Sequence, residues 1–287
     1  MPDHSCGERA GTSAGVDPAP MPAAVGSLVR RLQQAGCVYA EDEAALLLAE
    51  APGPARLEAM LAERVAGRPL ELVLGWAELA GVRVRVEPGV FVPRRRTELM
   101  VREAVALVVA AAGAGGRPVL VDLCCGTGAV GLAVLAGLGA EVAAGVELHA
   151  CDVDPAAVRC ARANLGGHGT VHGGDLDRSL PDSVRGRVAV LAANVPYVPS
   201  AEIALLPAEA RLHEPRRTLD GGPDGLRVVA RVADVAPSWL APGGSVLVET
   251  GERQVRAGTV LLADAGLVVR TVRDEELGAT VLVGRRP

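Results

Sequence analysis

The residues with the clearest chemical potential form the tetrapeptide Asn194-Val195-Pro196-Tyr197, which follows a short apolar run. An amide or exocyclic amine is a poor nucleophile, because its nitrogen lone pair is delocalised. Two acceptors aimed at its two N–H bonds would hold it in line with a methyl donor. The side-chain oxygen of Asn194 and the carbonyl of Val195 can supply this pair. Pro196 restrains the backbone there, and Tyr197 offers a flat face for a planar group. The same four residues would also suit a turn capped by Asn with a buried Tyr. The tetrapeptide therefore needs support from elsewhere in the chain.

A second signal is the stretch Val119-Leu-Val-Asp-Leu-Cys-Cys-Gly-Thr-Gly-Ala-Val-Gly-Leu132, which predicts a buried strand, a tight glycine turn and a helix. Gly126 and Gly128 lack a Cβ, so the backbone can turn sharply and a ligand can approach closely. Taken alone, this pattern is also typical of dinucleotide sites and of ordinary strand-to-helix turns.

Three acidic residues stand at the ends of successive predicted strands. Asp122 beside the glycine turn would repel a pyrophosphate but attract the ammonium of a methionine moiety. Asp152 can accept ribose hydroxyls, and Asp175 can accept a hydrogen bond from an adenine amino group. Asp154, before Pro155, is expected to be a helix N-cap. Together these residues predict S-adenosylmethionine as the cofactor. The predicted cofactor-binding residues are Asp122, Cys124, Gly126, Thr127, Gly128, Asp152, Val153, Asp175, Leu176 and Asn194.

The elements around these residues predict the fold class. Short apolar runs alternate with helical stretches after residue 96, which indicates an α/β fold with a mostly parallel sheet covered on both faces. In such a sheet, ligands bind at the carboxyl ends of the strands. The last two strands are close in sequence and are expected to be antiparallel. The expected strands are 118–123, 142–151, a short run near Val171, 188–193, 245–250, 267–272 and 280–283.

Four segments are expected along the chain. Residues 1–22 have the composition of a disordered tail, and residues 23–77 have helical periodicity interrupted at Pro52 to Pro54. Residues 78–95 are expected to be a β-hairpin linker with its turn at Pro88-Gly89. Residues 96–287 form the predicted catalytic domain, which begins with a helix at 96–112.

Composition limits the classes of function. The chain has 287 residues and a formal net charge of -5, which disfavours binding to long stretches of phosphate backbone. A direct nucleic-acid substrate is therefore not expected. The six cysteines lack CxxC spacing, so neither a metal site nor a disulfide framework is expected. No segment has the pattern of a membrane span, and we expect a cytoplasmic monomer.

Over nearly its whole length after the tail, the sequence resembles the release-factor glutamine methyltransferase (HemK/PrmC) family. The resemblance implies a Rossmann-like class I methyltransferase domain with a seven-stranded sheet, preceded by a small helical domain that helps to bind the protein substrate. It also implies N5-methylation of a glutamine in the Gly-Gly-Gln loop of a peptide-chain release factor, or of one in a ribosomal protein. Four stretches carry the likeness: Gly89 to Glu98, Asp122 to Gly131, Asn194 to Tyr197 and His213 to Leu226.

The family pattern also implies residues on the substrate side and shows two departures. By position, the substrate-binding residues would be Phe91, Pro93, Arg94, Tyr197 and Glu214. Val195 replaces the first proline of the family's Asn-Pro-Pro-Tyr, which should preserve the chemistry because the expected contact is a backbone carbonyl. Arg95 and Arg96 stand where the family usually has Pro and an acidic residue, which inverts a local charge near the expected substrate entrance.

The sequence leaves two other functions open. An N6-adenine methyltransferase for DNA or RNA could use the same tetrapeptide, with Tyr197 stacked on a flipped base. It would be favoured by a basic cluster at the pocket mouth, made of Arg94, Arg95, Arg96, Arg216 and Arg217. A non-catalytic adaptor with the same fold is disfavoured by the intact cofactor residues. The expected mechanism is in-line transfer from the sulfonium to nitrogen, with no metal and no covalent enzyme intermediate.

Overall fold

The computed structural model describes residues 23–287, so the tail expected at 1–22 lies outside the described part. The contacts divide the chain into two compact units between Leu61 and Ala62. The sequence placed a domain boundary near residue 77, whereas the division falls inside the third helix.

The first unit is helical, as its periodicity predicted. It contains α1 (Ala23–Gln34), α2 (Ala40–Glu50) and the start of α3 (Pro54–Val65). Leu32, Leu47 and Leu61 are fully buried and supply the largest side chains of its core. An ion pair between Arg31 and Glu58, at 2.6 Å, joins α1 to α3 on the exposed side. Because both side chains are exposed, the apolar contacts contribute most of the stability of this unit.

The second unit begins with α4 (Leu70–Leu74) and a β-hairpin, β1 (Trp76–Leu79) and β2 (Val82–Arg85). The predicted hairpin turn at Pro88-Gly89 is wrong, because the strands reverse at Ala80-Gly81. Both of these residues have positive φ, 50° and 78°, which suits a two-residue hairpin turn. Pro88-Gly89 instead makes a separate turn, in which the Val90 N–H donates to the Glu87 carbonyl at 3.1 Å. The segment after that turn reaches the candidate site at Phe91.

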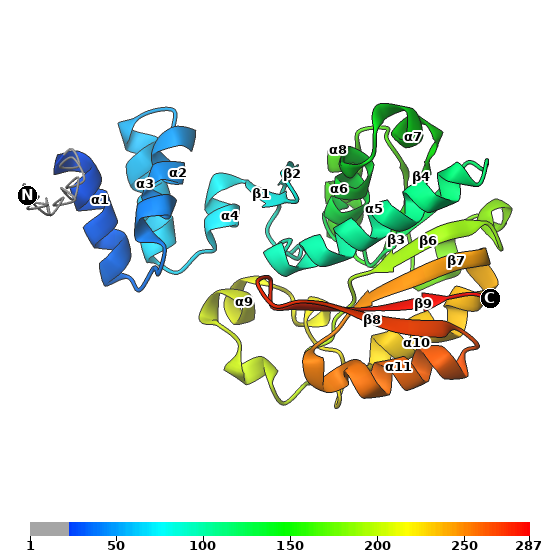
Figure 1. The fold of residues 1–287 in the computed structure, drawn as a ribbon. Helices are drawn as coiled ribbons and strands as arrows, with labels where there is room; N and C mark the ends of the chain where they lie inside the picture. The colour runs from blue at the N-terminus through cyan, green and yellow to red at the C-terminus, as the bar shows by residue number, and fades with distance from the viewer. Residues whose placement is uncertain (1–22) are drawn as a thin grey trace, which may run out of the picture. The chain divides into compact units, whose positions relative to one another are not determined.

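A seven-stranded sheet forms the centre of the second unit, in the order β5-β4-β3-β6-β7-β9-β8 (Figure 1). Strand β9 is antiparallel to both β7 and β8, and the other pairings are parallel. The predicted α/β class, with a mostly parallel sheet and an antiparallel pair at the end, is confirmed. The strands are β3 (Val119–Leu123), β4 (Glu147–Asp152), β5 (Thr170–Gly173), β6 (Val188–Ala193), β7 (Leu240–Glu249), β8 (Val268–Asp274) and β9 (Ala279–Arg285).

One predicted strand begins too early. The run from Val142 to Cys151 was expected to be a single strand, but its first part belongs to the short helix α7 (Ala140–Gly145). Alanines favour the helix, and the helix ends at Gly145, just before β4. Apolar residues alone do not distinguish a helix from a strand over so short a segment.

Helices cover both faces of the sheet (Figure 1). On one face lie α5 (Glu98–Gly113), α6 (Ala129–Gly137) and α8 (Pro155–Leu165), and on the other lie α10 (Arg227–Trp239) and α11 (Val255–Asp264). Successive strand residues face opposite cores, so Leu120 packs with the first set of helices and Val121 with the second. In the described part, α9 (Ala208–His213) is the only α-helix between β6 and α10, and no helix is long and apolar enough to cross a membrane.

The sheet order places a binding crevice between β3 and β6. From β3 the chain continues to β4 on one side, and from β6 it continues to β7 on the other side. Loops that leave two neighbouring parallel strands in opposite directions open a crevice at their carboxyl ends. The register aligns Leu123 with Ala193, so the glycine turn and Asn194 begin at the same level.

The packing of α11 on the sheet can be tested at Gly258. A Cβ at this position would lie 2.6 Å from Leu282 Cδ1, whose side chain is fully buried in β9. Because this core position has no room for a methyl group, we expect Gly258→Ala to lower the free energy of unfolding by about 1–3 kcal/mol. Gly113→Ala, at the end of α5 with nothing within 4 Å, is the matched control and should be neutral or slightly stabilising. Denaturant unfolding of both variants measures the difference, and equal stabilities would contradict this view of the interface.

Candidate active site

A cleft opens at the carboxyl ends of β3, β4, β5 and β6, and its space, open solvent included, is about 1030 Å³. The loops after these four strands supply most of the lining, and the segment before α5 and the residues around α10 supply the rest. The predicted site residues that line it are Phe91, Cys124, Gly126, Asp152, Val153, Asp175, Leu176, Asn194, Val195, Pro196 and Tyr197.

The turn after β3 is held against the end of β4. The Cys125 N–H donates to the Cys151 carbonyl at 3.0 Å, and the Gly126 N–H donates to Asp152 Oδ2 at 2.9 Å. Cys124 has a positive φ of 55°, and Leu176, across the cleft, has one of 52°. Positive φ in residues with a side chain costs energy and is concentrated at functional sites. The strained backbone thus lies where a ligand would be bound.

Asp152 uses both carboxylate oxygens to shape the cleft. Besides the bond from Gly126, its Oδ1 accepts from the Asp154 N–H at 2.9 Å. Burial raises the pKa of Asp152, while these backbone N–H groups lower it. Each oxygen still has acceptor capacity for a ligand hydroxyl. The Asp154 side chain accepts from the Ala156 N–H at 3.0 Å, which confirms the expected N-cap of α8.

Asp175 has a cationic partner in Arg231. Arg231 of α10 lies 2.8 Å from its Oδ2, and this hydrogen bond lowers the pKa of Asp175. Both residues line the cleft. Arg231 was missed by the sequence interpretation, because nothing in its local sequence indicates that α10 brings it beside the end of β5.

Asp122 lies in a smaller cavity that adjoins the cleft. Its side chain is almost completely buried and accepts from the Gly131 N–H at 2.9 Å. Burial raises the pKa of Asp122 to about 7, although the Gly131 N–H acts in the opposite direction. Thr127 and Pro93 line this smaller cavity but not the cleft. The residues common to both cavities are Phe91, Cys124, Gly126 and Asn194.

The tetrapeptide after β6 is fixed by its side chains. Asn194 Nδ2 donates to Thr97 Oγ1 at 3.2 Å, and the Tyr197 hydroxyl donates to Glu249 Oε1 at 2.8 Å. Burial, followed by the Glu249 carboxylate, raises the pKa of Tyr197. Tyr197 therefore remains a neutral phenol and a hydrogen-bond donor throughout the physiological range. Thr97 and Glu249 were given no role in the site by the sequence interpretation.

The backbone of the tetrapeptide is braced by the loop at residues 219–225. The Val198 N–H donates to the Leu219 carbonyl at 3.0 Å, and the Gly221 N–H donates back to the Val198 carbonyl at 2.9 Å. A Cβ at Gly225 would lie 2.2 Å from the Tyr197 carbonyl oxygen, so only glycine permits this approach. Gly221 and Gly225 of this loop thus hold the backbone of the tetrapeptide in place.

Three predicted site residues line neither cavity. Gly128 is the N-cap of α6, with φ of 75°. Arg94 and Glu214 form an ion pair with each other, and Glu214 is 6% exposed. The Arg94 guanidinium also lies 5.3 Å from the Phe91 ring centroid. Arg94 thus contacts the site through Phe91 and Glu214 pairs with Arg94, whereas both were expected to bind the substrate directly.

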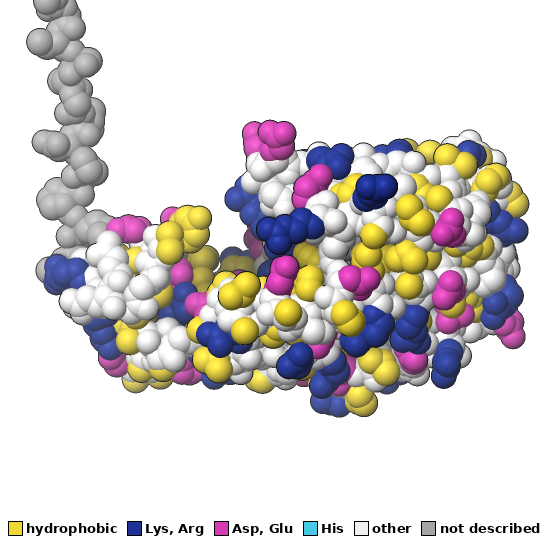
Figure 2. Space-filling model, turned by 90° about the horizontal axis from the view of Figure 1, so that it is seen from below, with side chains coloured by type: hydrophobic (Ala, Val, Ile, Leu, Met, Phe, Trp, Pro, Cys, Tyr) yellow, Lys and Arg dark blue, Asp and Glu magenta, His cyan; other side chains and the backbone are white. Residues whose placement is uncertain are grey.

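Most arginines near the cleft are paired with carboxylates, and of the predicted basic cluster only Arg95 has no ion pair in the described part of the chain. Figure 2 shows dark blue Arg side chains interspersed with magenta Asp and Glu side chains on the face that it presents. A nucleic-acid substrate needs a continuous basic surface, and these pairings remove most of that charge. The structure therefore does not supply the cluster that an adenine methyltransferase would need. The ion pairs are Arg94–Glu214, Arg96–Glu249, Arg216–Asp220, Arg217–Asp154 and Arg231–Asp175.

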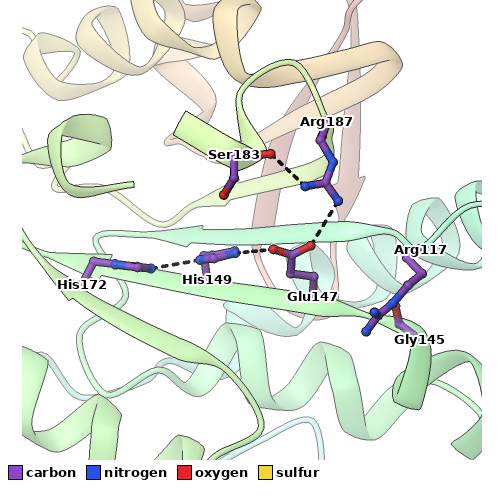
Figure 3. Close-up of polar contacts among 7 residues, drawn as sticks. All are labelled: Arg117, Gly145, Glu147, His149, His172, Ser183 and Arg187. Atoms are coloured by element: carbon purple, nitrogen blue, oxygen red, sulfur yellow. Dashed lines mark hydrogen bonds and ion pairs between the residues drawn. The ribbon is translucent and has the colours of Figure 1, made fainter. Parts of the chain in front are cut away.

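The histidines near the sheet edge lie outside the cleft, and the thiols of the turn after β3 are not activated. Figure 3 shows His172, His149 and Glu147 in a row on β4 and β5, where His149 Nδ1 lies 2.9 Å from His172 Nε2 and His149 Nε2 lies 3.1 Å from Glu147. Neither histidine lines the cleft. Burial raises the pKa of the Cys124 and Cys125 thiols, so neither is a ready nucleophile.

Sequence relatives align with most of this chain. No family model matches it. The release factor glutamine methyltransferase of Geobacter sulfurreducens is 32% identical over 230 residues, which cover 79% of this chain and 76% of that protein. The protein of the same name from Cereibacter sphaeroides is 34% identical over 284 residues, 92% of this chain and 97% of the relative. A solved release factor-specific protein-(glutamine-N5) methyltransferase from Alicyclobacillus acidocaldarius has a TM-score of 0.42 at 23% identity, covering 70% of this chain and 98% of that one. With the two sequence relatives at 32% and 34% identity, and with this arrangement of glycine turn, acidic strand ends and tetrapeptide, the chain belongs to the release factor glutamine methyltransferase family.

Proposed function

We propose that this protein transfers the methyl group of S-adenosylmethionine to the side-chain amide nitrogen of a glutamine in a peptide-chain release factor, in the cytoplasm. The fold is that of a class I methyltransferase, with the cleft at the switch point between β3 and β6. The observation that carries the proposal is that Asn194 and Val195 line the same cleft as Gly126 and Asp152. Donor and acceptor groups can therefore meet in one enclosure.

The residues of the cleft fit the methyl donor. The open acceptor positions of Asp152 suit the ribose hydroxyls, and Asp175 suits the adenine amino group. Gly126 has a positive φ of 54°, a backbone conformation that glycine adopts without strain in this tight turn. Asp122 suits the ammonium of the methionine moiety. When bound, the donor supplies an electrophilic methyl group on a positively charged sulfur.

The tetrapeptide would hold the acceptor. The Asn194 side-chain oxygen and the Val195 carbonyl would accept hydrogen bonds from the two N–H groups of the glutamine amide. The Tyr197 ring would lie against the plane of that amide. Such contacts position the nitrogen for in-line attack and favour the positive charge that develops on it. Alkylation acidifies the nitrogen, so its remaining proton can leave to water without a strong general base. The roles of Phe91 and of Pro93 at the substrate side stay proposals.

The N-terminal helices would recognise the release factor. The sequence assigned this role to residues 23–77, and the α1 to α3 helices form a compact unit with its own core.

The two departures from the family pattern leave the chemistry intact. Val195 is 2% exposed and would act through its backbone, while Arg96 is paired with Glu249 at 3.2 Å. Arg95 is exposed and remains available for contact with a substrate protein.

The proposal predicts where a labelled methyl group will appear. Incubation with labelled donor should transfer the label to a purified release factor, and mass spectrometry should locate it on a glutamine side chain. A release factor whose target glutamine is replaced by Glu should remain unlabelled. Ribosomal proteins and nucleic acid serve as competing substrates. Label on adenine with none on the release factor would favour the alternative enzyme class and overturn the proposal.

Removal of the Asn194 amide should separate transfer from donor binding. We expect Asn194→Ala to lower kcat by roughly 100-fold or more, because one of the two acceptors for the glutamine N–H bonds is lost. The Kd for the donor should change by less than about threefold, since the acidic strand ends remain. Single-turnover transfer and calorimetric titration measure the two quantities. A variant that transfers methyl groups at the wild-type rate would contradict the role of Asn194.

Donor binding should depend on pH through Asp122. Its pKa of about 7 lies above the ordinary value of 3.8, so below pH 7 it is mostly protonated and must lose its proton to bind an ammonium. Affinity should therefore rise with pH between 6 and 7.5, by at most about tenfold per pH unit. Asp122→Asn should weaken binding at pH 7.5 and flatten this dependence. Calorimetry at several pH values tests the prediction, and equal slopes in both proteins would exclude Asp122 as the titrating group.

A further inference from the structure

The orientation of the Asn194 amide decides whether it can serve as an acceptor. An asparagine side chain presents an oxygen on one side and an NH₂ group on the other, and the two have nearly the same shape. If the NH₂ group faced the cleft, it would meet the N–H bonds of the glutamine as a second donor. The proposed function therefore requires a contact that fixes the Asn194 amide from behind.

Thr97 provides that contact. Asn194 Nδ2 donates to Thr97 Oγ1 at 3.2 Å, and Thr97 is 1% exposed. Thr97 ends the 3₁₀ turn η1 (Arg95–Thr97) before α5, far from Asn194 in the sequence. A hydroxyl alone does not select one orientation, because it can donate as well as accept.

Glu249 removes this ambiguity. The Thr97 hydroxyl lies 2.8 Å from Glu249 Oε2, and a carboxylate can only accept. The single proton of Thr97 is therefore committed to Glu249, and only lone pairs of Thr97 remain for Asn194. The Asn194 NH₂ group must face Thr97, which leaves its oxygen for the cleft.

The same carboxylate also fixes the other end of the tetrapeptide. Glu249 Oε1 accepts from the Tyr197 hydroxyl at 2.8 Å and lies 3.2 Å from Arg96 Nε. Glu249 is the last residue of β7, next to β6 in the sheet, and is 2% exposed. A buried carboxylate needs such partners, and here two of its partners lead directly to Asn194 and Tyr197.

We propose that Glu249, acting through Thr97, is a positioning residue that holds the Asn194 oxygen toward the glutamine amide while it orients the Tyr197 ring. This inference rests on the proposed function, because it needs Asn194 to be an acceptor. It assigns a role in the reaction to two residues outside the main cleft, of which Thr97 lines the smaller cavity that contains Asp122.

Thr97 offers a clean set of variants. Thr97→Val keeps the shape and removes the hydroxyl, and we expect kcat to fall roughly 10- to 100-fold while the KM for release factor and the Kd for donor change less than about threefold. Thr97→Ser restores the hydroxyl and should recover kcat to within about threefold of wild type. Thr250→Val is the matched control, because Thr250 is 4% exposed and its hydroxyl has no hydrogen-bond partner in the described part of the chain. Its kcat should equal that of wild type.

A second variant and a second measurement keep the test valid if Thr97→Val does not fold correctly. Glu249→Gln keeps the volume but adds a donor, so the Thr97 proton is no longer committed, and kcat should again fall with donor binding retained. The side-chain amide signals of Asn194 in an ¹⁵N NMR spectrum, identified by their loss in Asn194→Asp, give a readout independent of activity. Their exchange with solvent should be slow in wild type and at least about tenfold faster in Thr97→Val.

The outcomes separate the inference from the proposed function. A wild-type enzyme that does not methylate glutamine would overturn the proposed function, and with it the kinetic role of Glu249. An active wild type with the same kcat and the same amide exchange as Thr97→Val would overturn the inference alone. Equal losses in Thr97→Val and Thr250→Val would also overturn it, because they would trace the effect to packing.

Discussion

The pairing of β3 with β6 is the constraint on which the site depends. These neighbouring strands align Leu123 with Ala193, and the chain leaves them in opposite directions. The strained turn that would bind the donor and the tetrapeptide that would hold the acceptor therefore begin side by side. Neither loop could be shifted by one residue without turning its strand's side chains to the opposite core. The apolar packing on both faces of the sheet thus determines where the polar groups of the cleft lie.

Local compensation of charge determines how the polar groups behave. Asp152 accepts hydrogen bonds from two backbone N–H groups. Glu249 accepts hydrogen bonds from the hydroxyls of Thr97 and Tyr197 and forms an ion pair with Arg96. Asp122 has one backbone donor in a nearly closed environment, and its pKa of about 7 reflects that difference. The three carboxyl groups of this site thus have different roles. Two keep loops and side chains in place, and the third can gain or lose its proton near neutral pH.

The sequence predicted the parts of the site that depend on short-range signals. The buried strand before Gly126, the cap at Asp154 and the tetrapeptide after β6 all lie where their patterns indicated. The hairpin turn was misplaced because Pro88-Gly89 forms a real turn of a different kind. The pairs Thr97–Glu249 and Arg94–Glu214 join residues 152 and 120 positions apart, and no local pattern reveals such partners. What escaped prediction was therefore the support behind the site, which only tertiary packing creates.

The departures from the family pattern separate chemistry from recognition. At position 195 the proposed contact is a backbone carbonyl, so a buried valine can replace proline while the acceptor remains. Arg96 stands in a position where the family usually has an acid, yet its guanidinium pairs with Glu249 and lies 5.7 Å from the Tyr197 ring centroid. Its charge is therefore used inside the site, where it balances the carboxylate that supports the tetrapeptide. Arg95 is exposed and has no such internal use. In the proposed function, Arg95 is therefore a candidate contact for the substrate protein, and the methyl-transfer geometry does not depend on it.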